Sequence, residues 1–395
     1  MSVLLPFRAL RPAPQVASRV ASVPYDVVNT EEARALTAAE PLSFLRVTRS
    51  EVDLPADMPP YDDRVYARAV QNLADLRQSA PLVQDSAPSL YVYRLRMGDH
   101  EQTGVAGLYS VDEYNRDLIK KHEKTRKDKE DDRTRHIKDT GAQTGVVFLT
   151  YRASDEIDAV VARVVKTPPL YTLTAVDGVG HEVWQVTGAD SDALVRGFAT
   201  LPALYIADGH HRAASAARSG AKHFIAVAFP DDQVQILSYN RTVKDLGNHT
   251  AESLMKALGD NGVLVSPGPS VPDRSGRVSM YLDGRWHTLE LPAPAAGTPR
   301  SDTLDVEVLQ QRVLNPILGV GDVRTDKRID FVGGIRGPAE LERLVKSGKA
   351  AVAFSLYPVS VADLMSIADA GGIMPPKSTW FEPKLRDGLL VHLIE

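Results

Sequence analysis

Five consecutive residues with chemically versatile side chains follow a short apolar segment near the middle of the chain. The apolar segment spans 204–207, and the run that follows it is Asp208-Gly209-His210-His211-Arg212. Gly209 permits a tight turn, and the backbone N–H groups of the helix expected after it form an anion site. Arg212 adds a planar set of donors suited to phosphate, and His210 and His211 donate or accept according to their protonation.

Asp208, at the end of the apolar segment, could bind a metal, orient a substrate hydroxyl or act as a base. In the structural alternative, Asp208 caps the helix, and both histidines are partly buried structural groups. We favour a functional site, because five such residues occur together at one predicted strand-to-helix turn.

A second candidate is the charged stretch 116–138, which contains ten Lys or Arg and six Asp or Glu residues, a local net charge of +4. A positive patch on an acidic protein can attract a small polyanion. The alternative is a solvated helix with ion pairs between residues four apart, such as Lys127 with Asp131. The residues of this stretch that could line a site are Lys121, His122, Arg126, Arg133 and Arg135.

Two further phrases are less specific. Asn240 and Arg241 follow an apolar strand and could line a polar pocket, although a surface turn explains them equally well. Lys377 and Ser378 follow two prolines, where a structural turn is the better interpretation. The sequence has no Walker A motif, dinucleotide-binding glycine fingerprint or His-Glu-x-x-His motif.

The elements that must position these residues are strands and helices in mixed order. Apolar runs predict buried strands at 146–151, 204–207 and 224–229, and helical periodicity predicts helices at 61–78 and from 209 to about 220. The pattern indicates an α+β fold with a mixed sheet. We expect four segments: 1–114 (α/β), 115–245 (the central domain with the phosphate and substrate site), 246–300 (containing a β-hairpin) and 301–395 (helix-rich).

Composition excludes several classes of protein. The 395 residues carry a net charge of −5, which argues against a general nucleic-acid binder. The absence of cysteine excludes disulfides, cysteine–metal sites and a cysteine nucleophile. The first residues do not resemble a signal peptide, and no apolar run is long enough for a membrane span. We therefore expect a soluble cytoplasmic protein with no nucleic-acid or membrane partner.

The motif Asp208 to Arg212, with its preceding apolar strand, resembles the signature of free serine kinases with the ParB/sulfiredoxin fold. The segment Ile119 to Glu123 resembles the part of those kinases that carries the catalytic glutamate. From about residue 6 onwards, the whole chain is similar to a large bacterial family of unknown function that shares this signature. The phrase Pro24-Tyr25-Asp26-Val27 is also typical of that family, as are Lys121 to His136, Tyr239-Asn240-Arg241 and Met374 to Phe381.

The resemblance implies a ParB/sulfiredoxin-like central domain, elaborated by N- and C-terminal segments. It also implies a kinase that phosphorylates free L-serine or a similar hydroxyl compound, with Mg²⁺ and a nucleotide donor, ATP or ADP. Glu123, Asp208 and His211 are then the candidate catalytic residues, and Gly209, His210, His211 and Arg212 bind the phosphates. The metal ligands are left unassigned. The two motifs are 85 residues apart (123 to 208), so an insertion lies between them.

The alternative function is a nucleotide-binding regulatory or partner-binding module with the same fold and no kinase activity. A homodimer is compatible with either function. Sulfiredoxin-type repair is excluded in its usual form, because that chemistry requires a cysteine thiolate.

Overall fold

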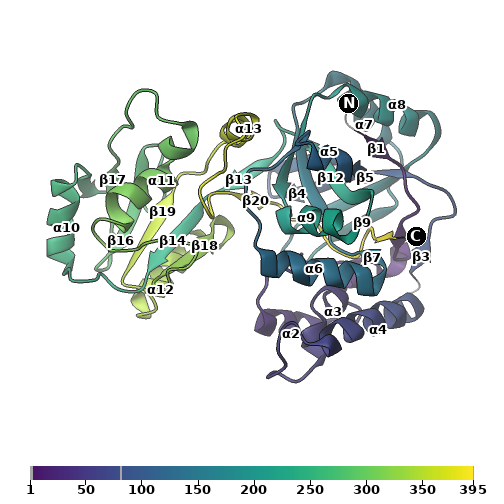
Figure 1. Cartoon of the computed structure of the whole chain (residues 1–395), viewed down its shortest axis with the longest axis horizontal. Helices are drawn as coiled ribbons and strands as arrows, with labels where there is room; N and C mark the ends of the chain where they lie inside the picture. Colours follow the sequence, from purple (N-terminus) through teal and green to yellow (C-terminus); the bar gives the residue numbers. More distant parts are fainter. Residues whose placement is uncertain (1–2, 81, 395) are drawn as a thin grey trace. The chain divides into compact units, whose positions relative to one another are not determined.

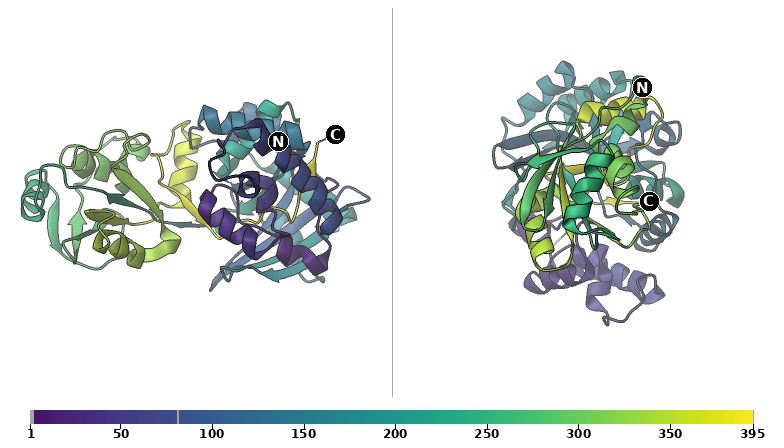
Figure 2. Two further views of the ribbon diagram at one scale, coloured as in Figure 1. Left: turned by 90° about the horizontal axis from the view of Figure 1, so that it is seen from below. Right: turned by 90° about the vertical axis from the view of Figure 1, so that its left-hand side faces the viewer.

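The computed structural model describes residues 3–80 and 82–394, and it divides the chain into two units. Unit 1 consists of Met1–Val234 together with Pro383–Glu395, and unit 2 consists of Gln235–Glu382. In Figures 1 and 2 the two ends of the chain both lie in unit 1. Unit 2 is therefore an insertion between the body of unit 1 and the short C-terminal segment of unit 1.

The described part of unit 1 is built on a nine-stranded mixed sheet with the order β6-β11-β8-β12-β5-β4-β10-β9, in which β1 also pairs with β5. Only β6 with β11 and β8 with β12 pair in parallel in this described sheet, and the other neighbours are antiparallel. The strands are β1 (Leu4–Leu5), β4 (Leu90–Met97), β5 (His100–Ser110), β6 (Ile119–Lys120), β8 (Val147–Tyr151), β9 (Tyr171–Thr174), β10 (Gly180–Val186), β11 (Leu204–Asp208) and β12 (His223–Pro230).

Helices cover this sheet and extend unit 1 at its N-terminal side. They are α1 (Ala17–Val20), α2 (Thr30–Ala39), α3 (Leu45–Thr48), α4 (Asp63–Ser79), α5 (Val111–Asn115), α6 (Lys127–Thr140), α7 (Asp155–Val164), α8 (Gly188–Thr200) and α9 (His210–Ser219). Helix α9 buries Ala213 and Ala216 in the main core, and these small side chains allow it to pack closely. Helices α6 and α9 lie side by side (Figure 1).

The C-terminal segment of unit 1 is held against the N-terminal segment and α6. Strand β21 (His392–Leu393) pairs with β7 (Ala142–Gln143), directly after α6. Single bridges connect Leu10 with Val391 and Ser22 with Asp387. A small pair of strands, β2 (Leu10–Arg11) and β3 (Val83–Gln84), completes this region.

Unit 2 contains a six-stranded sheet in its described residues, with the order β15-β17-β16-β19-β14-β18. Its strands are β14 (Tyr239–Val243), β15 (Leu264–Pro267), β16 (Arg277–Leu282), β17 (Arg285–Glu290), β18 (Ile329–Gly333) and β19 (Val352–Leu356). A separate pair consists of β13 (Gln235–Leu237) and β20 (Trp380–Glu382). The helices are α10 (Ala251–Asp260), α11 (Asp305–Leu309), α12 (Gly337–Lys346) and α13 (Val361–Asp369).

The expected α+β class with a large mixed sheet is confirmed. The predicted strands at 146–151, 204–207 and 224–229 correspond to β8, β11 and β12, and the helix predicted over 61–78 corresponds to α4. The four expected segments do not coincide with the two units, because the sheet of unit 1 takes strands from both sides of residue 115. The chain leaves unit 1 after Val234 rather than after residue 245. No helix in the ranges described has the length and apolar character needed to cross a membrane.

Substitution of a glycine tests how closely the C-terminal segment packs against Phe44. Gly388 has a φ of +87°, and a Cβ there would lie 2.7 Å from Cβ of the buried Phe44. We expect Gly388→Ala to lower the free energy of unfolding by about 2–4 kcal/mol, from left-handed backbone strain and overpacking together. The matched control is Gly141→Ala, which has a φ of +62° and open space around it, and should cost only about 1 kcal/mol. Equal losses in denaturant unfolding would show that Phe44 does not confine this segment.

Candidate functional site

The parallel pairing of β6 with β11 brings the two candidate motifs to one edge of the sheet. Leu204 pairs with Ile119, and Tyr205 pairs with Lys120. Because parallel strands run in the same direction, the residues that follow them emerge at the same edge. The segment that carries Glu123 therefore reaches the turn that follows Asp208, 85 residues later in the sequence (123 to 208).

The turn between β11 and α9 requires glycine for two reasons. Gly209 has a φ of +94°, and a Cβ at this position would lie 2.9 Å from Cζ and from Nε of Arg212. The Arg212 guanidinium therefore folds back over the turn instead of extending from the helix. A register shift in the pairing of β11 with β8 lies between Ile206 and Asp208, and such irregularities re-aim side chains at the end of a strand.

Arg212 is the centre of a buried cluster of charges. Its Nη2 lies 3.0 Å from Asp208 Oδ2 and 3.5 Å from Asp26 Oδ2, and its Nη1 donates to the carbonyl oxygen of Val146. Its side chain is only 5% exposed. Burial lowers the pKa of Arg212, but attraction to Asp26, Asp208 and Asp387 outweighs this effect and raises the pKa above its ordinary value. Arg212 therefore stays charged and faces inward.

Asp208 lies between this buried cluster and solvent, and its side chain is 30% exposed. Lys384, from the C-terminal segment, places Nζ 3.5 Å from Asp208 Oδ2. Burial raises the pKa of Asp208, but Lys384, Arg212 and His210 together bring that pKa below its ordinary range. Asp208 is therefore a carboxylate at neutral pH and accepts from both cations.

Asp387 carries the unusual carboxyl group of the cluster. It is 1% exposed, and a backbone hydrogen bond from Val146 reaches its carboxyl group. Burial raises its pKa to about 7, against the attraction of Arg212, and repulsion from Asp26 adds to the rise. The group therefore titrates near neutral pH, where Asp208 does not.

Two buried histidines lie side by side at the start of α9. The ring centroids of His122 and His210 are 4.4 Å apart in an edge-to-face arrangement, and His210 Nε2 accepts from the His122 backbone N–H at 3.4 Å. Burial lowers the pKa of His122 to about 4 and, together with the charge of a protonated His122, lowers that of His210. Both rings are neutral at pH 7. The charge of Asp208 and a backbone hydrogen bond with Ile206 partly oppose the fall in the pKa of His122.

Glu123 and His211 lie next to this pair. Glu123 Oε2 is 3.8 Å from His210 Nδ1, and the Glu123 side chain is 43% exposed. His211 Nε2 accepts from the Arg126 backbone N–H at 3.0 Å, which leaves the proton of the neutral ring on Nδ1. The sequence-predicted residues Glu123, His122, Asp208, Gly209, His210, His211 and Arg212 thus come together, with the backbone of Arg126.

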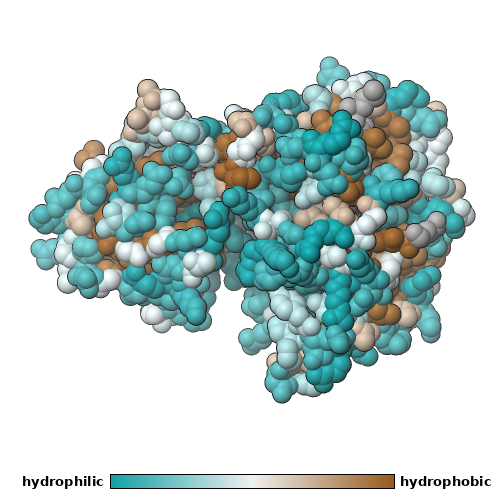
Figure 3. Space-filling view, in the orientation of Figure 1, coloured by the Kyte–Doolittle hydropathy of each residue, from teal (hydrophilic) through white to brown (hydrophobic). Residues whose placement is uncertain are grey.

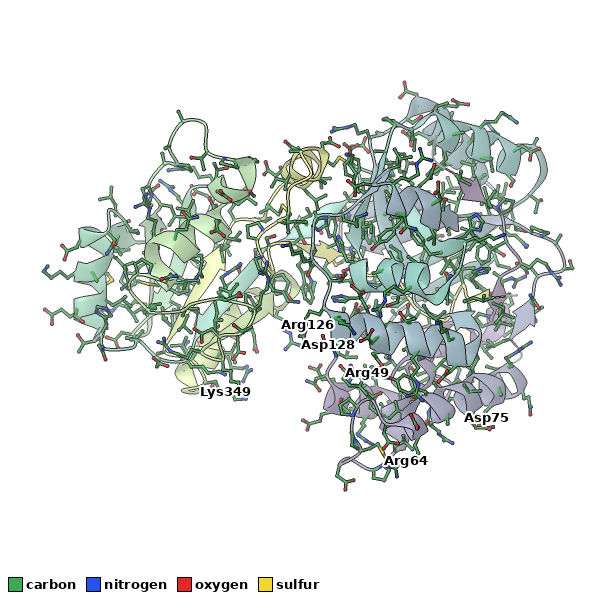
Figure 4. The ribbon with its side chains drawn as sticks, viewed as in Figure 1. Arg49, Arg64, Asp75, Arg126, Asp128 and Lys349 are labelled. Atoms are coloured by element: carbon green, nitrogen blue, oxygen red, sulfur yellow. The ribbon has the colours of Figure 1, made fainter. Side chains whose placement is uncertain are left out.

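The charged stretch otherwise behaves mainly as a solvated helix. Figure 4 labels Arg126 and Asp128 beside the start of α6, where their side chains pair at 2.8 Å, and the surface over α6 is mostly hydrophilic (Figure 3). Lys127 and Asp131 form the expected pair at 2.8 Å. Arg218 of α9 contacts Glu130 at 2.9 Å, which clamps α6 to α9.

Other predicted site residues have partners elsewhere. Lys121 Nζ donates to the Tyr114 carbonyl and pairs with Asp117, and Arg135 pairs with Asp63 and Asp139. Arg133 pairs with Asp132 and lies over the ring of Tyr25. Tyr25 directly precedes Asp26 in the sequence. Asn240 and Arg241 belong to unit 2, where Asn240 accepts from the Leu356 N–H and Arg241 donates to the carbonyls of Tyr239, Pro376 and Lys377.

Sequence reasoning assigned no role to Asp26, Lys384 or Asp387. Asp26 lies in the phrase Pro24-Tyr25-Asp26-Val27, whose resemblance to the family of unknown function was the available signal. Lys384 and Asp387 lie in a tail with no periodic pattern, so only the tertiary structure places them.

Carboxylate oxygens are the groups at this site that could act as ligands of a hard cation such as Mg²⁺. Asp26 and Asp208 both contact Arg212 Nη2 and are both partly exposed. The described residues contain no group of three or more His, Cys, Asp or Glu side chains that could hold a metal. Two carboxylates fit Mg²⁺, which proteins bind with one or two carboxylates plus substrate phosphates.

A protein-family model matches residues 4–309 of this sequence and is described as "Protein of unknown function (DUF1015)". The chain belongs to the DUF1015 family. The expected membership of a family of unknown function is thus confirmed, and the DUF1015 match includes both Glu123 and the Asp208–Arg212 motif. A search of curated proteins finds no match to the chain.

Several solved structures resemble this DUF1015 member at low similarity. A conserved hypothetical protein from Pyrococcus furiosus is 15% identical with a TM-score of 0.37, covering 73% of this chain and 95% of that chain. A free serine kinase in complex with AMP is 13% identical with a TM-score of 0.38, covering 73% and 91%. SbnI with a C-terminal truncation, from Staphylococcus aureus, is 12% identical with a TM-score of 0.42, covering 73% and 87%.

The buried cluster predicts a large stability effect at Arg212. We expect Arg212→Met to lower the free energy of unfolding by about 3 kcal/mol or more at pH 7, because Asp208 and Asp26 lose their buried counter-charge. The matched control is Arg163→Met, which breaks an exposed pair with Asp190 and should cost less than about 1 kcal/mol. Denaturant unfolding measures both, and an Arg212→Met loss no greater than that of the control would contradict the cluster.

The raised pKa of Asp387 predicts that the difference in stability between Asp387→Asn and the unsubstituted protein depends on pH. Between pH 4 and pH 7 the unfolded chain releases this proton while the folded chain keeps it, so the contribution of Asp387 to stability falls as pH rises and levels off above pH 7. Asp387→Asn lacks this titration. Its stability relative to the unsubstituted protein should therefore increase by about 2–4 kcal/mol from pH 4 to pH 8. A difference that stays constant across this range in denaturant unfolding would refute the assignment.

Proposed function

We propose that unit 1 is a small-molecule kinase that transfers a phosphoryl group from a nucleotide to the hydroxyl of free L-serine or a similar compound. The observation that carries this proposal is the meeting of Glu123 with the Asp208–Arg212 turn through the parallel pairing of β6 and β11. The resemblance of both segments to free serine kinases supports the reaction, the nucleotide donor and a ParB/sulfiredoxin-like core.

The start of α9 is the proposed phosphate site. Its first N–H groups carry the positive end of the helix dipole, and the residue before the helix is Gly209, which has no side chain to obstruct a phosphate. His211 lies in the first turn of the same helix and is proposed as a further phosphate-binding residue. Arg212 is already held by Asp26, Asp208 and Val146, so we assign it to fixing Asp208 rather than to the phosphate.

Glu123 is the proposed general base. Its carboxylate is partly exposed and stands beside the phosphate site, so it can take the proton of an incoming hydroxyl. The acceptor oxygen forms a bond to phosphorus while the bond from phosphorus to the leaving group of the donor breaks. Phosphoryl transfer depends mostly on positioning and charge stabilisation, and this arrangement offers both.

Asp208 and Asp26 are the proposed Mg²⁺ ligands, with Asp208 also able to orient the hydroxyl. Mg²⁺ when bound would neutralise charge on the donor phosphates. The permanent charges of Arg212 and Lys384 keep Asp208 ionised over the neutral pH range, and this prepares it for either role.

The proposal predicts a product and its loss in one variant. Full-length protein with Mg²⁺, a donor (ATP, ADP or pyrophosphate) and L-serine or a panel of hydroxyl compounds should form a phosphomonoester detectable by mass spectrometry. Glu123→Gln should lower kcat by about 100-fold or more, because it removes the base. The matched control is Glu156→Gln on the exposed start of α7, which should retain full activity.

Two results would overturn this function. Formation of no phosphomonoester from any donor and acceptor, with nucleotide still bound by the protein, would favour the regulatory nucleotide-binding module. Unchanged kcat in Glu123→Gln would remove Glu123 from the role of base.

A further inference from the structure

The two histidines of the Asp208–Arg212 motif both contact the loop between β6 and α6, which spans 121–126. His210 Nε2 accepts from the His122 backbone N–H at 3.4 Å, and His211 Nε2 accepts from the Arg126 backbone N–H at 3.0 Å. Backbone N–H groups outside helices and sheets need other partners, and the start of α9 supplies two of them. The motif therefore holds this loop at both of its ends.

His210 contacts two consecutive residues of the loop with its two ring nitrogens. Its Nε2 accepts from the backbone of His122, and its Nδ1 lies 3.8 Å from Oε2 of Glu123. The ring also packs edge-to-face against the His122 ring, with 4.4 Å between the centroids. One buried side chain thus contacts both the backbone that precedes the proposed base and the carboxylate of that base.

These contacts determine which nitrogen of His210 carries the proton. A neutral imidazole has one N–H, so a ring that accepts at Nε2 is protonated at Nδ1. Burial and the charge of a protonated His122 keep the pKa of His210 well below its ordinary value, against the attraction of Asp208. The ring is therefore neutral at pH 7, and the nitrogen next to Glu123 Oε2 is the donor.

The surroundings of the His210 ring suit contact with Glu123 better than contact with a phosphate. The His210 side chain is 4% exposed, whereas that of Glu123 is 43% exposed. A phosphate would have to share the single N–H of His210 with the carboxylate. Two anions on one neutral donor repel each other, so the ring can serve only one of them well.

We propose that His210 is a positioning residue, whose Nδ1–H donates to Oε2 of Glu123 and orients this carboxylate for proton transfer. This inference rests on the proposed function and gives His210 a role other than phosphate binding. A glutamate side chain has several rotatable bonds, and this one lies in a loop, so it needs a donor to select one orientation. The separation of 3.8 Å shortens to a hydrogen bond when substrate is bound.

Substitutions that keep or remove the Nδ1 donor test this role. Asparagine places its amide N–H close to the position of Nδ1, whereas phenylalanine has no donor. His210→Phe should lower kcat about 10- to 100-fold and change KM for donor and acceptor less than about threefold, because only the base is misplaced. His210→Asn should recover most of the lost kcat. The matched control is His181→Phe, which removes a buried ring of β10 that contacts Tyr93 at 3.0 Å, and it should leave kcat unchanged.

Two kinetic results would overturn the role of His210 and leave the kinase proposal standing. The first is a raised KM for the donor with unchanged kcat in His210→Phe, which would return His210 to phosphate binding. The second is an equal loss of kcat in His210→Phe and His210→Asn, which would show that the Nδ1 donor is not what matters.

A second measurement uses the unsubstituted protein and does not depend on turnover. Nitrogen NMR of the histidine side chains distinguishes a ring protonated at Nδ1 from one protonated at Nε2, and the signals of His210 are those missing in His210→Asn. We expect the Nδ1–H form at pH 7, with a Nδ1 shift that changes in Glu123→Gln. A ring protonated at Nε2 would overturn the role of His210 even in an active kinase. The Nδ1–H form in a protein that makes no phosphomonoester would overturn the proposed function and keep the pairing of His210 with Glu123.

Discussion

The burial of one guanidinium is the constraint on which the rest of the site depends. Arg212 is 5% exposed, and a charge in that position is tolerated only with carboxylates around it. Asp208 comes from the same turn, Asp26 from the N-terminal segment and Asp387 from the C-terminal segment. One buried side chain therefore interacts with carboxylates from three distant parts of the chain.

Arg212 and Lys384 contact the same carboxylate but have different surroundings. Arg212 is saturated and holds Asp208 as a carboxylate, while Lys384 contacts the same oxygen at a longer distance. The neutral rings of His122 and His210 lie side by side, and Glu123 Oε2 is 3.8 Å from His210 Nδ1. Under the proposed function, the carboxylate of Glu123 and the N-terminus of α9 lie close to this charged cluster, which suits transfer of a charged group.

The sequence was sufficient where the chemistry is local. The strand, glycine turn and helix around Asp208 follow from residues adjacent in the chain, and the pair Lys127 and Asp131 follows from helical spacing. Residues joined only by tertiary structure were not predictable: Lys384 has no pattern around it, and the inward turn of Arg212 depends on Asp26 and Val146. Placing Asn240 and Arg241 in the central domain failed to anticipate that the chain leaves unit 1 after Val234.

The most direct test of this account is a crystal structure of the full-length protein with Mg²⁺ and a non-hydrolysable ATP analogue. The account predicts that the phosphate chain lies at the start of α9, with its terminal phosphate beside Glu123 and with Mg²⁺ on Asp208. Clear density for the analogue at another place, with the start of α9 occupied only by water, would contradict it.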